Sequence, residues 1–401
     1  MSTATTIDAA SLGFDPGDPH FVRDPYPVYD RLRGAAGPVH FAANDWWLVS
    51  RHAEVDALLR HRGLGRVFTP REPYERFAPW NLVNEHAMLE LEPPDHTRLR
   101  RLVSKAFTPR RIEALRPAIR DLTDRLLDGL LDDGGGDVVA ELAEPLPVEV
   151  IGELLGIDPA DRALLRPWSN AIVALYEPVT DPAVEQAAID AAADFSAFLR
   201  ELIVRRRSDP GDDLFSALVG LQDDGDRLSE DELVATAVLL LNAGHEASVN
   251  VLSNAVAHLL GERSHWQQLV DDPGLVPTAV EEAIRYDTPL SVFTRFAAED
   301  VEVGDLRIAA GQTVGLLLGA ANRDPAAFAA ADALDVARTP NPHVGFGAGI
   351  HFCLGAALAR VELQEALGRL LARAPALDLA AEPVRRSSYQ FRGFATVPVG
   401  L

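Results

Sequence analysis

The chain has 401 residues, of which 47% are apolar and 24% charged, a balance typical of a globular protein with ample material for a core. Its 37 basic and 60 acidic side chains give a net charge of −23, which argues against a general binder of nucleic acid or anionic membranes. The single cysteine excludes an internal disulfide and a thiolate zinc cluster.

No run in the chain reaches the roughly 18 to 20 apolar residues of a membrane span. Residues 1–6 show neither the charged region nor the apolar region of a signal peptide. We therefore expect a soluble, cytoplasmic protein that binds neither nucleic acid nor a membrane. With no repeat and no interdomain linker, residues 1–401 are predicted to form a single domain, mainly α with a small β portion at two ends of the sequence.

Short elements are predicted after a polar N-terminal lead over residues 1–24. The run Asp24-Pro25-Tyr26-Pro27 precedes a short helix at 28–33, residues 39–49 predict a hairpin, and 52–60 predict another helix. Residues 61–92 are predicted to be irregular and rich in aromatic side chains. Such a long loop is commonly a lid or a binding wall, although aromatic anchors that merely pin the loop explain it equally well.

Helical patterns dominate from Pro93 onward. Thr108 and Pro109 are typical of an N-cap and the first helical position. The predicted helices cover about 109–131, 143–156, 159–176, 183–207 and 212–222. The stretch 168–185 between two of them is a second candidate for a substrate lid.

The strongest helix signal begins at Ser229, which forms a capping box with Glu232. The pattern continues to about Leu260 without a proline and is apolar on most sides, so this helix is predicted to be buried and to cross the molecule. Gly244 in its middle costs about 1 kcal/mol relative to alanine. Close approach of a flat partner to the face of Ala243 and Gly244 would account for that glycine.

The C-terminal third adds three further features. Glu282 and Arg285 lie at i and i+3 on one face of a predicted helix, and Arg338 could complete a buried Glu–Arg–Arg network with them. Residues 292–313 alternate like strands with a turn at Gly304.

The last feature is the run Phe346-Gly347-Ala348-Gly349-Ile350-His351-Phe352-Cys353-Leu354-Gly355. A thiolate at Cys353 would sit at the N-terminus of the helix that follows, where the macrodipole favours negative charge. Taken alone, this cysteine could equally be a buried structural residue.

Together, these features resemble the cytochrome P-450 superfamily of haem-thiolate monooxygenases, and specifically its soluble bacterial members. The resemblance spans nearly the whole chain and implies the P-450 fold, with the long central helix crossing over haem b (iron protoporphyrin IX). It implies Cys353 as the proximal iron ligand, Phe346 as the aromatic residue packed beside the ligand loop, and Ala243 as a haem contact. The other residues that it implies are the propionate partners His96, Arg100, Arg295 and His351, and the structural triad Glu282, Arg285 and Arg338.

The family's usual distal pattern is Ala-Gly-x-acid-Thr, whose threonine helps to deliver protons to dioxygen. Here Gly244 and the acid Glu246 are present, but Ala247 stands at the threonine position and Ser248 points about 100° away around the helix. Three explanations are open: a substrate hydroxyl replaces the threonine, water held by Ser248 and Glu246 relays protons, or the reaction depends less on a proton relay.

Asn242 occupies a position that is usually apolar and faces substrate in the family, so it predicts a hydrogen bond to a polar substrate group. The alternative is an amide bonded to a helix carbonyl one turn back. The same alignment implies that the pocket is lined by Trp80, Leu290, Val292, Phe293 and Phe394, together with Trp168 and Tyr176.

No flavin- or nicotinamide-binding glycine fingerprint is present, so the resemblance implies electrons from a ferredoxin and its reductase. A basic cluster suited to an acidic ferredoxin is predicted from Arg101, Lys105, Arg110, Arg111 and Arg360. We expect a monomer that hydroxylates a medium-sized organic or secondary-metabolite substrate with O2. Oxidative demethylation or phenol coupling is the enzymatic alternative, and a haem-binding recruitment module is the alternative without turnover. A Cys353/His351 hydrolase is disfavoured, because it leaves the cations His96, Arg100 and Arg295 unexplained.

Overall fold

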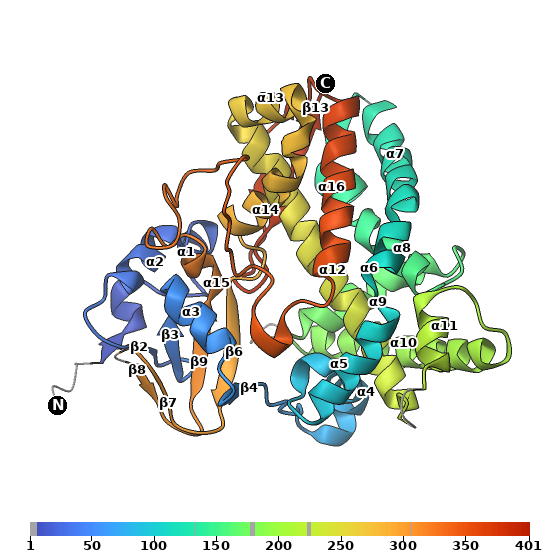
Figure 1. The fold of residues 1–401 in the computed structure, drawn as a ribbon, viewed down its shortest axis with the longest axis horizontal. Coiled ribbons are helices and arrows are strands. Elements are labelled where there is room, and N and C mark those ends of the chain that lie inside the picture. The colour runs from blue at the N-terminus through green and yellow to red at the C-terminus, as the bar shows by residue number, and fades with distance from the viewer. Residues whose placement is uncertain (1–5, 133, 177–180, 223–225, 305) are drawn as a thin grey trace.

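The computed structural model describes residues 6–132, 134–176, 181–222, 226–304 and 306–401. Helices gather on one side of the molecule and a sheet lies on the other (Figure 1). The α-helices are α1 (Pro19–Arg23), α2 (Tyr26–Arg33), α3 (His52–Leu59), α4 (Tyr74–Glu85), α5 (Asp95–Ala106), α6 (Pro109–Ala114), α7 (Arg116–Asp132), α8 (Pro145–Leu154), α9 (Leu165–Ala174), α10 (Pro182–Ser208), α11 (Leu214–Gly220), α12 (Glu230–Gly261), α13 (Arg263–Asp271), α14 (Val276–Tyr286), α15 (Leu318–Ala321) and α16 (Ala356–Arg373).

The main sheet joins strands from the first 65 residues with two strands from residues 292–317. Its strand order is β1-β2-β3-β9-β6-β4, and β3 pairs in parallel with β9. The strands are β1 (Ile7–Asp8), β2 (Val39–Phe41), β3 (Trp46–Val49), β4 (Leu64–Gly65), β5 (Gly135–Asp137), β6 (Val292–Ala297), β7 (Val301–Val303), β8 (Leu306–Ile308), β9 (Thr313–Leu317), β10 (Asp378–Leu379), β11 (Val384–Arg385), β12 (Phe394–Thr396) and β13 (Pro398–Gly400). The predicted hairpin at 39–49 is confirmed, with Asp45 at a positive φ of 55° in its turn.

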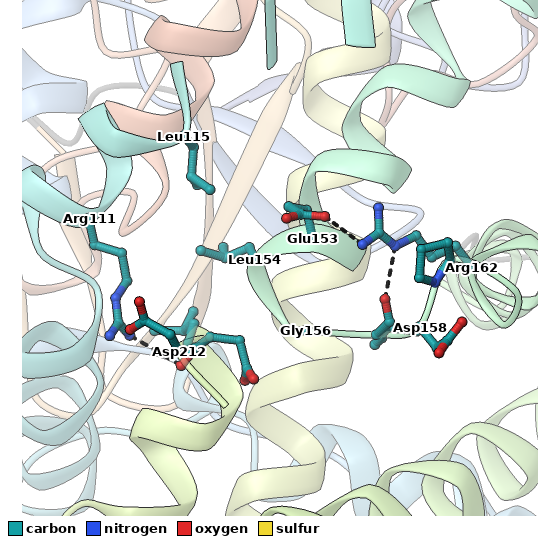
Figure 2. A pocket seen from close by; sticks show the side chains of 12 residues that line it. Arg111, Leu115, Glu153, Leu154, Gly156, Asp158, Arg162 and Asp212 are labelled. Atoms are coloured by element: carbon teal, nitrogen blue, oxygen red, sulfur yellow. Dashed lines mark hydrogen bonds and ion pairs between the residues drawn. The ribbon is translucent and has the colours of Figure 1, made fainter. Parts of the chain in front are cut away.

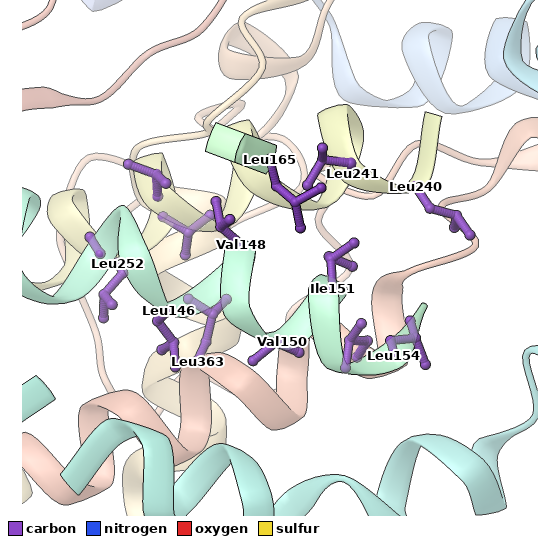
Figure 3. Close-up of a cluster of buried hydrophobic side chains, with 14 of the residues drawn as sticks. Leu146, Val148, Val150, Ile151, Leu154, Leu165, Leu240, Leu241, Leu252 and Leu363 are labelled. Carbon is purple, nitrogen blue, oxygen red and sulfur yellow. The ribbon is translucent and has the colours of Figure 1, made fainter. Parts of the chain in front are cut away.

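Helix α12 is the buried axis of the helical side, as its sequence predicts. Ser229 caps it, and the capping box with Glu232 is present in both directions. Its leucines pack between α8, α9 and α16; Figure 3 shows Leu240, Leu241 and Leu252 of α12 among these partners. Burial of each such side chain contributes about 1.5 to 3 kcal/mol, so α12 is held in place along most of its length. In the described part of the chain, no helix is long and apolar enough to cross a membrane.

The prediction of irregular structure over 61–92 is wrong in part, because α4 forms from Tyr74 to Glu85. Pro79 inside it argues against a helix on sequence grounds. Packing compensates, since Phe77 and Trp80 bury one face of α4 in the main core. The second predicted lid, 168–185, includes residues 177–180, which lie outside the described residues.

Candidate functional site

The loop that carries Cys353 is shaped by glycines and closes onto the start of α16. Gly347 and Gly349 have φ values of 67° and 70°, and a side chain at Gly349 would meet the carbonyl oxygen of Leu59 at 2.6 Å. The backbone N–H of Cys353 donates to the carbonyl of Phe346 at 2.9 Å. The sulfur therefore lies just before the first turn of α16, which begins at Ala356.

Opposing influences act on the thiol of Cys353. Desolvation by the surrounding protein is the largest influence and raises its pKa above the ordinary thiol value, although the backbone N–H groups of Gly355 and Ala356 and the cations of Arg100 and Arg360 act in the opposite direction. The side chain nonetheless keeps exposed surface. The thiol is therefore accessible, and these four groups partly offset its desolvation and would stabilise the thiolate that a bound metal ion requires.

Four cationic or imidazole side chains gather beside this loop. The His96 and His351 rings lie 4.5 Å apart, and Arg100 donates to the carbonyl of Phe352 at 2.9 Å. Burial lowers the pKa of His96 to about 4, with help from His351 and Arg100. Burial likewise lowers the pKa of Arg295 to about 10. The predicted propionate partners are thus brought together.

Two of these groups lack a partner that their burial demands. His96 is 2% exposed, and among the described residues its Nδ1 has no hydrogen-bond partner. Arg295 is 3% exposed, and within the same part of the chain it has no ion pair with a carboxylate; its Nη1 donates to the carbonyl of Thr294 and its guanidinium lies over the Phe293 ring. Buried polar groups of this kind cost free energy unless they are paired. A flat ligand with two carboxylates would pair them beside the sulfur, so the residues present fit haem.

The Glu282, Arg285 and Arg338 side chains form the network expected from their spacing. Arg285 binds Glu282 through two bonds of 2.8 and 2.7 Å, and Arg338 Nε lies 3.0 Å from the same carboxylate. Both arginines also donate to the carbonyl of Ala333. Because residues 329–338 lead toward the cysteine loop, this network fixes the segment that supports it.

The middle of α12 presents an open face. Ala243 and Ala247, four residues apart, are exposed in a stretch where their neighbours are mostly buried. Gly244 does not belong to that face, which corrects our interpretation of it: a Cβ there would lie 3.1 Å from Ile151 Cδ1 of α8. Gly244 lets α12 and α8 pack closely, whereas the small side chains of Ala243 and Ala247 leave room on the open face.

Glu246 and Ser248, the polar neighbours of Ala247, both lie close to charged or ionisable side chains that the sequence does not indicate. Glu246 Oε2 lies 2.8 Å from Arg386 Nη1, so its partner comes from the C-terminal region. Glu362 of α16 is 3% exposed, and burial raises the pKa of its carboxyl to about 8, while nearby Ser248 opposes the rise. Sequence reasoning missed Arg386 and Glu362. The signal for Glu362 was an acid between two apolar residues of an amphipathic helix.

Asn242 is 4% exposed, and neither its Oδ1 nor its Nδ2 has a partner within hydrogen-bond distance among the described residues. The helix-carbonyl alternative is therefore not realised. Tyr176, whose hydroxyl donates to Asn84 Oδ1 at 2.9 Å, comes close enough to Asn242 for the amide to lower its pKa. Trp80 packs on Tyr176 with ring centroids 5.7 Å apart and donates to the carbonyl of Ile172. The unpaired amide of Asn242 therefore lies next to the aromatic side chains of Tyr176 and Trp80.

Other predicted pocket residues are distributed differently. Phe293 stacks under Arg295 at 4.3 Å, whereas Val292, which faces the opposite side of β6, packs in the N-terminal core with Phe14. Phe394 is also misplaced by the prediction: its N–H donates to Ser253 Oγ, about 16 Å along α12 from Asn242. Phe391 instead forms a backbone β-bridge with Leu290, another predicted pocket residue.

A depression of about 370 Å³ lies elsewhere, between α6, α8 and the start of α11. Figure 2 shows that charged side chains line it, with Arg162 bound to Glu153 at 2.6 Å. None of the predicted site residues except Arg111 of the basic cluster borders it. Arg162, Glu153 and Asp213 in its lining already form ion pairs within the protein, so its size alone does not make it the functional site.

The predicted basic cluster is only partly available for a partner. Arg360 binds Glu281 through bonds of 2.7 and 2.8 Å and covers the Phe346 ring at 4.5 Å. Arg111 donates to the carbonyl of Asp213. Arg101, whose Nη2 lies 3.4 Å from Asp226 Oδ2, is exposed together with Lys105 and Arg110 on or next to α5.

Comparisons with known proteins identify the family and the fold. The family model described as Cytochrome P450 matches residues 172–375. The sequence is 42% identical to Cytochrome P450 107B1 of Saccharopolyspora erythraea, covering 100% of this chain and 99% of that protein. It is also 42% identical to 6-deoxyerythronolide B hydroxylase of the same organism, covering 94% and 96%. The solved structure of P450BioI in complex with hexadec-9Z-enoic acid ligated acyl carrier protein matches with a TM-score of 0.90 and 35% identity, covering 95% of this chain and 99% of that one.

Proposed function

Because this chain belongs to the cytochrome P450 family and is a haem-dependent monooxygenase, we propose that it hydroxylates a medium-sized secondary metabolite that carries a polar group. The observation that carries this proposal is Cys353 at the start of α16, combined with the open Ala243/Ala247 face of α12. Haem held by Cys353 and by the cluster of His96, Arg100, Arg295 and His351 would supply dioxygen activation, which the thiolate favours by donating electron density.

Spectroscopy tests this assignment directly. The reduced protein under carbon monoxide should show the red-shifted Soret band of thiolate-ligated haem, and a screen of ligands by Soret shift should identify the substrate class. A protein that takes up haem without the red-shifted band would favour a recruitment module. Product analysis separates the alternatives, because demethylation releases formaldehyde and phenol coupling joins two rings without inserting oxygen.

Hydroxylation consumes one dioxygen, two electrons and two protons for each alcohol and water formed, so the protein must admit protons to the Ala247 face. Glu246 is held as an ion pair by Arg386, whereas the raised pKa of Glu362 leaves its carboxyl protonated near pH 7, with Ser248 close enough to influence it. We propose that Glu362 and Ser248 hold and pass this proton, with a substrate hydroxyl completing the route that Ala247 leaves open.

Replacing Ala247 with threonine tests whether the missing hydroxyl matters. If a substrate hydroxyl serves in its place, the added side chain should compete with the substrate and reduce the ratio of product to reductant consumed, by up to the roughly 100-fold typical of a disturbed proton transfer. The ratio is measured from product formed and NADPH oxidised. An unchanged ratio would show that Ala247 is incidental.

Glu362→Gln should change how stability depends on pH. Between the ordinary carboxyl pKa of 4.5 and the folded value of about 8, the unfolded chain releases a proton that the folded protein keeps. Wild-type stability therefore falls as pH rises through this window. Glutamine stays neutral, so the variant should gain about 2–4 kcal/mol over the wild type between about pH 5 and pH 8, measured by urea unfolding.

Glu365→Gln, one turn later on α16, is the matched control. Its carboxyl is paired with Arg116 and Arg120, which lower its pKa against a desolvation that raises it. Removing that charge should therefore destabilise the protein at neutral pH and have no effect at low pH, the opposite trend. Parallel pH curves for the two variants would contradict the assignment of Glu362.

Asn242→Leu should separate stability from recognition. Leucine removes two buried amide atoms that lack partners among the described residues, which should stabilise the protein by about 1–3 kcal/mol. It should also weaken ligands that hydrogen-bond to the amide by about tenfold or more, because their own polar group becomes unpaired. Thermal unfolding and Soret titration measure the two effects. Asn84→Leu is the control for the neighbouring amide, which bonds within the protein to Tyr176 and Trp80 and should lose stability instead.

Electrons are proposed to come from a ferredoxin and ferredoxin reductase, docked on the exposed side chains of Arg101, Lys105 and Arg110. The rate of reduction should then fall as salt is added, because exposed charges are screened within about 8 to 10 Å. The cytoplasmic location and the monomeric state expected from the sequence belong to the same proposal.

A further inference from the structure

Within the described residues, the carboxylate of Glu246 has one charged partner, and it comes from the far end of the chain. Arg386 Nη1 lies 2.8 Å from Glu246 Oε2 and 3.3 Å from Asn250 Oδ1, one helical turn later on α12. The Glu246 side chain is 8% exposed and that of Arg386 is 28% exposed. A carboxylate so far removed from water depends on a cation for its charge.

Arg386 is held by the loop that joins β11 to β12. Its backbone N–H donates to the carbonyl of Gly393 at 3.1 Å. A side chain at Gly393 would lie 2.1 Å from Asn250 Oδ1, so glycine is what allows this loop to reach α12. The geometry of the arginine is therefore set by a close contact between the loop and the helix.

The other edge of the same loop forms part of the proposed pocket. The N–H of Ser291 donates to the carbonyl of Gln390 at 3.1 Å, and the N–H of Arg392 donates to that of Pro289 at 2.8 Å. Between these bonds, Phe391 bridges Leu290. One loop thus contacts both the pocket wall and the acid next to Ala247.

We propose that Arg386 is the positioning residue for Glu246. It holds the Glu246 carboxylate against the 386–393 loop, turned away from the Ala247 face. Release of this carboxylate therefore depends on how the loop packs against the pocket wall. The proposal rests on the monooxygenase function above. A purely structural ion pair would contribute to folding but leave the fate of dioxygen unchanged, and this difference makes the proposal testable.

The test uses haem-loaded Arg386→Gln, Arg386→Lys and wild type, reduced by a surrogate ferredoxin, its reductase and NADPH. Loss of a charge-assisted hydrogen bond shifts the equilibrium between the held and the released carboxylate by about tenfold. Arg386→Gln should therefore raise the ratio of hydrogen peroxide to water formed from dioxygen by about tenfold. It should also change the solvent deuterium isotope effect on NADPH oxidation. Arg386→Lys keeps a cation and should restore most of both values.

Arg385→Gln is the matched control, because Arg385 is the preceding residue and pairs at 2.6 Å with a different buried acid, Asp287. It should lower the melting temperature but leave the peroxide ratio and the isotope effect unchanged. Equal changes in both arginine variants, or an Arg386→Gln enzyme that matches the wild type, would overturn the proposal. So would a lysine variant that behaves like glutamine.

A readout without turnover comes from thermal unfolding of Glu246→Gln, Arg386→Gln and the double variant. If the two side chains act on each other, the double variant should lose no more in melting temperature than the worse single variant; additive losses would overturn the proposal. Failure of the monooxygenase assignment itself is distinguishable, since the wild type would then lack the red-shifted Soret band.

Discussion

Replacement of Cys353 by serine is expected to abolish the red-shifted Soret band of the reduced carbon monoxide complex and to eliminate hydroxylation. A hydroxyl has a far higher pKa than a thiol and remains a weak, neutral ligand, whereas the thiolate is stabilised by Gly355 and Ala356 N–H groups and by Arg100 and Arg360. The loop itself should survive, because its backbone bond to Phe346 does not involve the sulfur. Spectra before and after reduction, with product analysis, measure both losses.

The control places a thiol elsewhere. Cys353 is the only cysteine of the chain, so a Cys353→Ser, Ser208→Cys variant has one thiol again, at an exposed residue that ends α10. Thiol titration should return to one per chain while the Soret band stays lost. Recovery of the band by this distant thiol would contradict ligation by Cys353.

Replacement of Arg285 by alanine is expected to lower the free energy of unfolding by about 3–5 kcal/mol and to reduce haem retention. Arg285 and Glu282 are both 0% exposed. Without Arg285, the carboxylate keeps Arg338 as its cation, and the carbonyls of Asn322, Ala331 and Ala333 lose a donor. Urea unfolding of the haem-free and haem-loaded protein measures the loss.

Arg307→Ala removes an ion pair of similar bond length that is exposed to water. Arg307 Nη2 lies 2.8 Å from Asp300, but the two side chains are 69% and 52% exposed. Water and salt screen such a pair, so its removal should change stability little. If both variants had the same small effect, burial of the Glu282 network would not be what stabilises the segment before the cysteine loop.

Two acids compete for the role of the proton carrier, and their environments differ in kind. An arginine pairs with the carboxylate of Glu246, whereas desolvation keeps Glu362 protonated at neutral pH. A carboxyl that already carries its proton can give it up to a neighbouring hydroxyl, and one locked in an ion pair first has to leave its partner. The pH curve of Glu362→Gln and the peroxide ratio of Arg386→Gln therefore report on two different steps.

The sequence alone determined the features that depend on local spacing. The glycine-flanked Cys353, the capping box of α12, the Glu282/Arg285 pair and the hairpin at 39–49 all follow from residues within a few positions of each other, where helix and turn geometry leaves few choices. The same holds for the extent of α12, which ends within a residue of its expected end.

Only the tertiary structure decided which distant side chains meet. Arg386 reaches Glu246 across 140 residues, Phe391 rather than Phe394 reaches Leu290, and Gly244 of α12 faces Ile151 of α8. Such pairings depend on how loops and helices pack onto helix faces. The sequence around one partner does not determine where the other partner lies. For the same reason, the burial that raises the pKa of Glu362 became visible only once α16 was packed against α12.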